Sequence, residues 1–326
     1  MTWVVSERTP PEPAALKVVA LGGGHGLSAS LSALRRVVQH VTAVVTVADN
    51  GGSSGRLRSE FGVLPPGDLR QALAALCGDD DWGRTWARVL QHRFASNGPM
   101  DEHAVGNLLI VALWELLGDH VDGLAWVARL LGAQGTVLPM SVSAIDITAT
   151  VRGASPEEPE ALSTVCGQVE VASTAGQVVS VDLSPADPAA CPEALEAVAE
   201  ADWTVLGPGS WYTSVIPHLL VPELRRALVS APGRRAVTLN LAPQTGETDG
   251  YSPEAHLEVL GGYAPDLKLD VVLADERVVG DLGGLRSSAA SFGAELVVAD
   301  VAADDGTPRH DPVKLANAYA SFLGEA

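Results

Sequence analysis

A glycine-rich segment that joins two runs of apolar and β-branched residues is the strongest constraint on the fold of this chain. The runs are residues 17–21 (KVVAL) and 41–48 (VTAVVTVA), and the glycine-rich segment LGGGHG at 21–26 follows the first run directly. Between the glycines and the second run, apolar side chains recur at helical spacing, at Leu27, Leu31, Leu34 and Val38. Strands that are buried on both faces have this composition, which favours a parallel sheet covered by helices. The segment therefore predicts a right-handed βαβ unit.

The same alternation continues along the chain. Helices are expected over 69–76, 82–94, 105–116, 192–199, 221–230, 253–260 and 311–323, and strands over 203–206, 236–241, 270–273 and 295–298. Strand-like pieces separated by Gly, Pro and Ser fill residues 136–184, which we interpret as a β-rich insertion because so short a stretch cannot build a robust core. The predicted fold is α/β, a Rossmann-like, doubly wound, mostly parallel sheet with this insertion. Residues 1–16 are expected to be a flexible N-terminal tail, and 17–326 a single domain.

The charge balance excludes several classes of partner. Among 326 residues, 21 are Lys or Arg and 40 are Asp or Glu, which gives a formal net charge of −19. Such a chain repels nucleic-acid phosphates and anionic membranes, so we expect no nucleic-acid partner. No stretch of about 18 uncharged apolar residues is present, so we also expect no membrane insertion. The first 13 residues lack an apolar signal segment, and no disulfide framework or zinc site is expected from Cys77, Cys166 and Cys191, so we expect a cytoplasmic protein.

The glycine-rich segment has the composition of a phosphate-binding loop. Glycines between a strand and a helix let backbone N–H groups approach an anion, and the helix N-terminus adds partial positive charge. Residues 24–29 (GHGLSA) also fit the GxGxxA dinucleotide fingerprint, with Asp49 as the acidic residue expected about 20 positions further on. The alternative is a tight turn without a ligand. The candidate binding residues of this loop are Gly22, Gly23, Gly24, His25, Gly26 and Leu27.

A second polar segment follows the second expected strand. Residues 48–58 (ADNGGSSGRLR) place an acidic residue, hydroxyls, glycines and arginines at the sheet edge where open α/β folds bind ligands. The hydroxyls and the backbone can bind phosphate oxygens, and Arg56 can supply a forked donor. A flexible, solvated loop is the alternative. The candidates here are Asp49, Asn50, Gly52, Ser53, Ser54 and Arg56.

Further candidates lie at the starts of expected helices. Asp68, in the segment LPPGDLR, either contacts the ligand or caps a helix. His103 and Asn107 are four residues apart and so share a helix face other than the leucine face, which favours a ligand-side role over an ordinary surface pair. Arg309 precedes the last helix and can contact an anion, whereas pairing with Asp311 is the alternative.

The turn after the strand at 203–206 is again rich in glycine and hydroxyl groups. Two such turns on one sheet suggest the two ends of one ligand, or two phosphates. Residues 240–251 follow another expected strand and are polar at the same edge. No GxSxG or HExxH motif is present, so catalytic residues stay unassigned; acidic loop residues can hold Mg²⁺ through ligand phosphates, but no metal-ligand spacing is visible. The candidates of this turn are Gly207, Pro208, Gly209, Ser210, Tyr212, Thr213 and Ser214.

Seven segments, taken in order, resemble the bacterial gluconeogenesis-factor family, also called YvcK-like or GlmR-like, within the CofD-like superfamily. They are GGGHGLS at 22–28, VTVADNGGSSGRLR at 45–58, LPPGDLR at 64–70, HAVGNLL at 103–109, LGPGSWYTSVIPHLLVP at 206–222, QTGETDGY at 244–251 and RHDP at 309–312. The resemblance extends from about residue 17 to the end of the chain. It implies a Rossmann-like cytoplasmic protein that binds UDP-sugars, UDP-N-acetylglucosamine above all, with NAD as another ligand. It also implies a regulator of cell shape and cell-wall precursor supply during gluconeogenic growth, rather than an established enzyme.

The resemblance further implies that residues 22–26, 49–56 and 207–214, together with Arg309, line the nucleotide site. Two positions depart from the usual family pattern, His25 in place of Thr and Asn50 in place of a second Asp. Relatives in the superfamily are Mg²⁺-dependent 2-phospho-lactate transferases, and the missing carboxylate at position 50 weakens that hypothesis here. A UDP-sugar-binding regulator is favoured, with a phospho-lactyl transferase and an NAD-binding oxidoreductase as alternatives. We expect a homodimer with a regulatory protein partner in amino-sugar or cell-wall synthesis.

Overall fold

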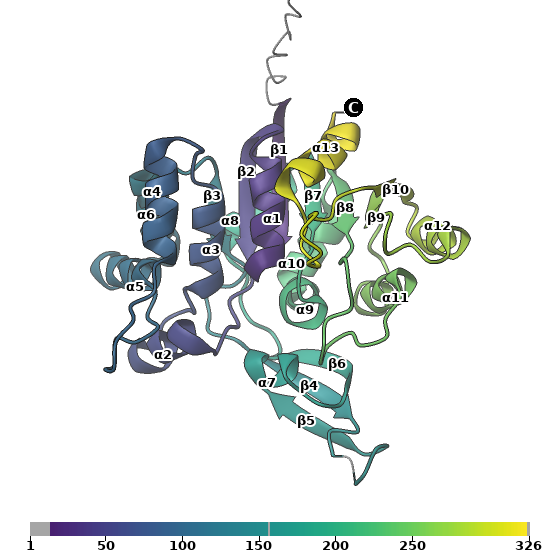
Figure 1. Cartoon of the computed structure of the whole chain (residues 1–326), viewed down its shortest axis with the longest axis horizontal. Helices are drawn as coiled ribbons and strands as arrows, with labels where there is room; N and C mark the ends of the chain where they lie inside the picture. Colours follow the sequence, from purple (N-terminus) through teal and green to yellow (C-terminus); the bar gives the residue numbers. More distant parts are fainter. Residues whose placement is uncertain (1–13, 156, 325–326) are drawn as a thin grey trace, which may run out of the picture.

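A seven-stranded parallel sheet forms the centre of the structure (Figure 1). The computed structural model describes residues 14–155 and 157–324. Every pairing between neighbouring strands of this sheet is parallel. The chain therefore has the predicted α/β fold, and the strand order reverses between β1 and β7. In spatial order, the strands are β10 (Glu295–Ala299), β9 (Val271–Asp275), β8 (Arg234–Thr238), β7 (Trp203–Leu206), β1 (Ala14–Gly22), β2 (Val38–Val45) and β3 (Thr136–Pro139).

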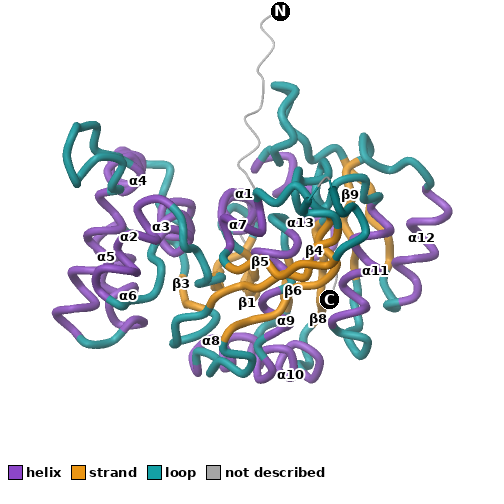
Figure 2. The backbone as a smooth tube through the Cα atoms, turned by 90° about the horizontal axis from the view of Figure 1, so that it is seen from below, coloured by secondary structure: helices purple, strands orange, loops and turns teal. Residues whose placement is uncertain are grey.

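Helices cover both faces of this sheet. Figure 2 shows α1 (Gly24–Leu34) and α13 (Pro312–Leu323) on one side, and α8 (Pro192–Glu200) and α10 (Pro222–Ser230) on the other. In the described residues, no helix is both long and apolar enough to cross a membrane. The remaining helices are α2 (Gly52–Phe61), α3 (Gly67–Ala75), α4 (Asp81–Gln91), α5 (Val105–Leu117), α6 (His120–Leu131), α7 (Gln168–Ala172), α9 (Pro217–Leu220), α11 (Pro253–Tyr263) and α12 (Leu282–Ser291), with a π-helical turn η1 at Trp211–Val215.

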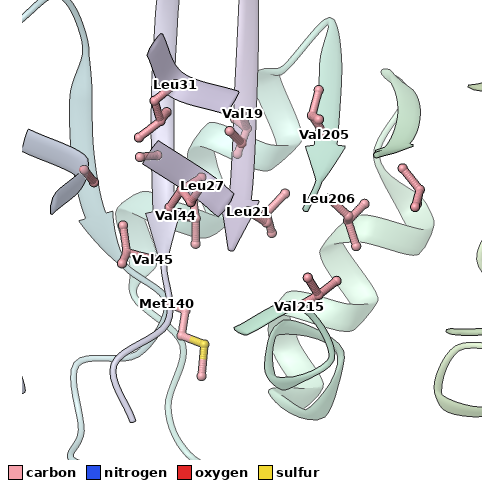
Figure 3. Packing of buried hydrophobic residues seen from close by; sticks show 14 of the residues in the cluster. Val19, Leu21, Leu27, Leu31, Val44, Val45, Met140, Val205, Leu206 and Val215 are labelled. Carbon is pink, nitrogen blue, oxygen red and sulfur yellow. The ribbon is translucent and has the colours of Figure 1, made fainter. Parts of the chain in front are cut away.

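The central strands bury both of their faces, as their apolar composition predicted. The four consecutive residues 18–21 of β1 are each at most 2% exposed. Leu27 and Leu31 of α1 lie next to Val19 of β1 and Val44 of β2 (Figure 3). Burial of one such leucine contributes about 1.5–3 kcal/mol. The core therefore fixes the carboxyl ends of β1 and β2, from which the predicted glycine loop and the second loop emerge.

The predicted insertion is smaller than residues 136–184. β4 (Asp146–Arg152), β5 (Leu162–Cys166) and β6 (Gln177–Ser184) form a separate antiparallel sheet in the order β5-β4-β6, and α7 lies beside it. The first predicted strand of the insertion, β3, instead pairs parallel with β2 in the main sheet. Four residues carry too little pattern to show which sheet they join. Residues 168–172 form α7, a short helix within the stretch that was expected to hold only strand-like pieces.

Other predicted boundaries require correction. β1 begins at Ala14, so residues 14–16 belong to the sheet and not to the predicted tail, while residues 1–13 lie outside the described residues. β2 covers residues 38–45 rather than 41–48, because Thr46, Val47 and Ala48 are buried in a connection that has the composition of a strand. The segment predicted as the second loop contains the helix α2, which was not predicted because its sequence is rich in Gly and Ser. The helices α6 and α12 were not expected either.

Candidate functional site

Two glycine turns touch at the carboxyl edge of the sheet. β1 ends at Gly22, and its parallel neighbour β7 ends at Leu206. A Cβ atom on Gly26 would lie 2.3 Å from the carbonyl oxygen of Pro208 and 2.5 Å from the Cα of Gly209, so only glycine permits this approach. The strand order reverses between β1 and β7, and open α/β sheets bind ligands at such a switch point. The two predicted turns therefore meet where the fold favours a ligand.

Polar side chains of residues 240–244 hold the second turn in place. The Gly209 N–H donates to Oδ1 of Asn240 at 3.0 Å, and Nδ2 of Asn240 donates to the Gly209 carbonyl at 2.8 Å. The Trp211 N–H donates to Oε1 of Gln244 at 3.2 Å. These bonds fix the backbone that faces the glycine loop of residues 22–26.

Glu247 carries a buried carboxyl group behind the same turn. The residue is 4% exposed, and its carboxylate accepts hydrogen bonds from the Thr213 hydroxyl at 2.9 Å and the Tyr212 N–H at 3.0 Å. The Ser210 hydroxyl also donates to Glu247. A buried carboxylate is tolerated only with such donors, because unpaired burial of a charge is costly. The predicted hydroxyls of residues 210 and 213 therefore bind Glu247.

Two adjoining cavities open beside these turns. The first, of about 400 Å³, lies between the start of α1, the turn at 208–209 and residues 240–244 and 308–312. The second, of about 430 Å³, lies between the glycine loop, α3, α7 and residues 244–247. His25 and Gln244 line both cavities. Small-molecule sites commonly have volumes of about 300–1,000 Å³, so the pair can accommodate one extended ligand.

Only part of the predicted site lines these cavities. The predicted residues at the first cavity are His25, Gly26, Pro208, Gly209 and Arg309. Those at the second are Gly24, His25, Asp49, Asp68, Ser210, Thr213 and Ser214. The other predicted residues line neither cavity: Gly22, Gly23, Leu27, Asn50, Gly52, Ser53, Ser54, Arg56, His103, Asn107, Gly207 and Tyr212.

The hydroxyls of the second loop bind protein groups rather than facing a cavity. Ser53 Oγ lies 3.1 Å from Nδ1 of His103 and accepts a 3.0 Å hydrogen bond from Nδ2 of Asn107. Ser54 Oγ accepts a 2.9 Å hydrogen bond from the Gly67 N–H. His103 precedes α5 instead of sharing a helix face with Asn107, and burial lowers its pKa. These side chains fix α2 against the first turns of α3 and α5, and their contact with a ligand stays a prediction.

The two predicted arginines differ in their surroundings. Arg56 donates to the carbonyl oxygens of Pro99 at 3.2 Å and Asp101 at 2.6 Å, so it tethers a neighbouring loop rather than facing a cavity. Arg309 lines the first cavity, and its Nη2 lies 2.7 Å from Oδ2 of Asp305. Pairing with Asp311 was the alternative to an anion contact, and the acidic partner of Arg309 in the structure is instead Asp305.

Asp68 combines burial with a position on the second cavity. α3 begins at Gly67, so Asp68 lies inside its first turn and is not its N-cap. The residue is 9% exposed, and its carboxyl group lies against the backbone of Gly23 and Gly24. Burial, followed by the charge of Asp49, raises the pKa of Asp68 to about 7, against the opposing effects of the Gly24 N–H and Arg70. Asp68 therefore changes its charge near neutral pH.

Several cavity residues were not predicted. Residues 240–251 were noted only as polar at the correct sheet edge. Their position after a strand could have indicated that Asn240, Gln244 and Glu247 lie at the site. Nothing in the local sequence marks the two glutamines of α3 and α7, because only the tertiary fold brings those helices to the second cavity. The unpredicted polar residues of the two cavities include Gln71, Gln168, Asn240, Gln244, Glu247 and His310.

The residues do not provide a protein-only metal site. Within 14–155 and 157–324, no group of three or more His, Cys, Asp or Glu side chains could hold a metal ion. At position 50, where the family usually has a second Asp, the Asn50 amide is bonded to Glu170 and to the Val169 N–H. The donor set therefore does not fit a dedicated Mg²⁺ centre.

Comparison with known proteins agrees with this architecture. A family model described as "2-phospho-L-lactate transferase CofD" matches residues 18–306. A crystal structure of a UPF0052 family member from Bacillus halodurans has a TM-score of 0.83 and 32% sequence identity, covering 93% of this chain and 98% of that chain. The doubly wound sheet with glycine turns at its switch point is thus the architecture of a CofD-type α/β protein.

Similar sequences define the group more narrowly. A Mycobacterium tuberculosis H37Rv protein named "Putative gluconeogenesis factor" is 52% identical over 302 residues, which is 92% of this chain and 88% of that protein. The "Gluconeogenesis factor" of Bacillus subtilis 168 is 34% identical over 265 residues, 81% of this chain and 80% of that protein. The chain belongs to the gluconeogenesis-factor family, as the seven sequence segments predicted.

Proposed function

We propose that this protein is a regulatory protein that binds a UDP-sugar, namely UDP-N-acetylglucosamine. The proposal is carried by the contact of Gly26 with Pro208 and Gly209, which brings two glycine turns together beside two adjoining cavities. Backbone N–H groups at the start of α1 offer partial positive charge to a diphosphate. The two cavities would then take the nucleoside and the sugar on either side of the diphosphate.

Local charge must drive this recognition. The net charge of −19 opposes the approach of an anionic ligand, so the long-range field gives no assistance. Arg309 is the predicted cation at the first cavity. Its Nη2 and Nε are held by Asp305 at 2.7 Å and by the Thr307 hydroxyl at 2.9 Å. These two hydrogen bonds at one edge of the guanidinium group fix its orientation. The planar group can then donate hydrogen bonds from its other edge to a phosphate.

The names of the relatives support the biological part of the proposal. Relatives in Bacillus and Listeria are named gluconeogenesis factors. The ligand-bound protein would report the supply of amino-sugar nucleotide to a partner in amino-sugar or cell-wall synthesis. It would thereby sustain cell shape and cell-wall precursor supply during gluconeogenic growth, as a cytoplasmic homodimer.

Thermal unfolding tests the ligand assignment. UDP-N-acetylglucosamine should raise the melting temperature, because a ligand that binds only the native state stabilises it. UDP-glucose and NAD, tested at the same concentrations, establish whether the sugar or the nucleotide is selected. No shift at millimolar UDP-N-acetylglucosamine would contradict the proposal.

A second candidate is a Mg²⁺-dependent phospho-lactyl transferase. The observation in its favour is the printed description of the matching family model, a 2-phospho-L-lactate transferase. The protein would be incubated with Mg²⁺, a phospho-lactyl-guanosine donor and the deazaflavin acceptor. Formation of the joined product would support this function over a purely regulatory one, and lack of turnover would reject it.

A further inference from the structure

The carboxylate of Asp68 lies at the start of α1, where an anionic ligand would also be attracted. A Cβ atom on Gly23 would lie 2.5 Å from Oδ2 of Asp68, and one on Gly24 would lie 4.0 Å from its Oδ1. Gly23 is the N-cap of α1 and supplies no side-chain cap. The partial positive charge of a helix N-terminus attracts anions. The chain therefore places an anion of its own in the phosphate cradle predicted from the glycine loop.

The charge of Asp68 is set by groups from every side of the second cavity. Asp49, after β2, disfavours ionisation, while Arg70 of α3 and the Gly24 N–H favour it. His25 of α1 and Glu247 line the same cavity. Burial has the largest effect and, together with the charge of Asp49, raises the pKa of Asp68 to about 7. Both charge states of Asp68 are thus accessible at neutral pH, and they interact differently with an anionic ligand.

The ionised and neutral carboxyl groups have opposite consequences for a bound diphosphate. Ionised Asp68 repels an anionic ligand at the start of α1, whereas neutral Asp68 can donate its proton to a ligand oxygen. We propose that Asp68 takes up a proton when an anionic ligand binds in the second cavity, so that binding is proton-linked and Asp68 is a specificity-determining residue of the site. This inference rests on the proposed function, because it concerns the same ligand site.

Calorimetric titration with UDP-N-acetylglucosamine at pH 6, 7 and 8 tests the inference. The diphosphate diester of this probe does not titrate in this range, so a linked proton belongs to the protein. Affinity should fall about tenfold from pH 6 to pH 8, because the protonated fraction of a group with a pKa near 7 falls about tenfold between these two pH values. Titration at pH 8 in two buffers of different ionisation enthalpy should show uptake of close to one proton.

Substitutions assign the proton to Asp68. Asp68→Asn is neutral at every pH and should bind with an affinity that does not change between pH 6 and 8. Asp49→Asn removes a charge that disfavours ionisation of Asp68, so the pH dependence should move to lower pH; this second variant keeps the test available if Asp68→Asn does not fold. Asp266→Asn, on an exposed residue that precedes β9, is the matched control and should retain the wild-type pH dependence.

Three outcomes contradict the inference. Equal affinity at pH 6 and pH 8 without proton uptake would overturn proton linkage but leave the proposed function intact. A pH dependence that persists unchanged in Asp68→Asn would assign the proton to another group. Absence of binding at every pH would contradict both the inference and the proposed function, so the two failures are distinguishable.

Discussion

The side chain of Asn50 joins the main domain to the small antiparallel sheet through Glu170. Nδ2 of Asn50 donates to Oε2 of Glu170 at 2.7 Å, and Oδ1 of Asn50 accepts from the Val169 N–H at 3.0 Å. The first of these bonds lowers the pKa of Glu170. An amide can donate and accept at the same time, and a carboxylate cannot. The Asn at this position is therefore matched to the glutamate of α7, whose neighbours Gln168 and Val169 line the second cavity.

Asn50→Asp should loosen this connection. The substitution places two carboxylates within hydrogen-bond distance, so like-charge repulsion replaces a charge-assisted bond. Hydrogen exchange followed by mass spectrometry should show faster exchange in α7 and β4–β6, with little change in β1 and β2. Adding Glu170→Gln should restore slow exchange, because the glutamine amide can donate to the new carboxylate at position 50. Unchanged exchange in Asn50→Asp would show that the bond does not hold the two parts together.

Gly26→Ala should separate the two glycine turns. The new methyl group would meet the backbone of Pro208 and Gly209 at 2.3 and 2.5 Å, and backbone atoms cannot move aside cheaply. Overpacking of this kind costs about 1–3 kcal/mol, and we expect the loss of UDP-N-acetylglucosamine binding in addition. Gly262→Ala in α11 is the control, since a Cβ there has no atom within 4 Å. In chemical denaturation, the free energy of unfolding of Gly262→Ala should be unchanged or higher by up to about 1 kcal/mol. Equal behaviour of the two variants would argue against the contact.

Arg309→Ala should weaken nucleotide-sugar binding more than tenfold, because loss of one charge-assisted hydrogen bond costs about 1.5–3 kcal/mol. Arg152→Ala breaks a comparable exposed pair with Glu160, at 3.5 Å in the small sheet, and should leave the affinity unchanged. Calorimetry measures both variants. Affinity that survives in Arg309→Ala would remove this arginine from the ligand site.

His218 should make the protein less stable in acid. It is fully buried, its Nε2 lies 3.0 Å from the Val44 carbonyl, and burial lowers its pKa from 6.5 to about 4. The unfolded chain binds a proton near pH 6.5 and the folded protein near pH 4, so stability present above pH 6.5 is lost as the pH falls towards 4. Asp68, with a raised pKa, contributes a slope of the opposite sign between about pH 4 and pH 7.

The difference between wild type and His218→Gln isolates the histidine contribution. Glutamine can donate to the same carbonyl and does not titrate. Urea unfolding at pH 4.5 and pH 7 should show that the variant loses about 1–3 kcal/mol less on acidification. Equal losses in both proteins would mean that His218 is not kept neutral by the fold.

The sequence predicts those parts of the fold whose local pattern and tertiary environment agree. Residues 18–21 and 203–206 are in strands that are buried on both faces, and glycine is required where the following turns touch. β3 was misassigned because four residues cannot show which sheet they join. α2 was missed because tertiary hydrogen bonds to Ser53 and Ser54 support a helix that local propensity disfavours.

The candidate site divides in the same way. Glycine turns were predictable, since their backbone conformation and position follow from the strand ends. The binding partners of polar side chains could not be predicted, because a serine or arginine in a loop can bind either a ligand or another loop. Ser53 and Arg56 bind protein groups, while Asn240 and Gln244, from a segment noted only for polarity, support and line the first cavity.

A crystal structure of the protein with UDP-N-acetylglucosamine would show whether the two touching glycine turns bind the diphosphate. We predict that the diphosphate lies between residues 24–26 and 208–209, within hydrogen-bond distance of backbone N–H groups, with Arg309 turned towards it. A sugar nucleotide bound elsewhere on the molecule, with these two turns making no contact to its phosphates, would contradict the account.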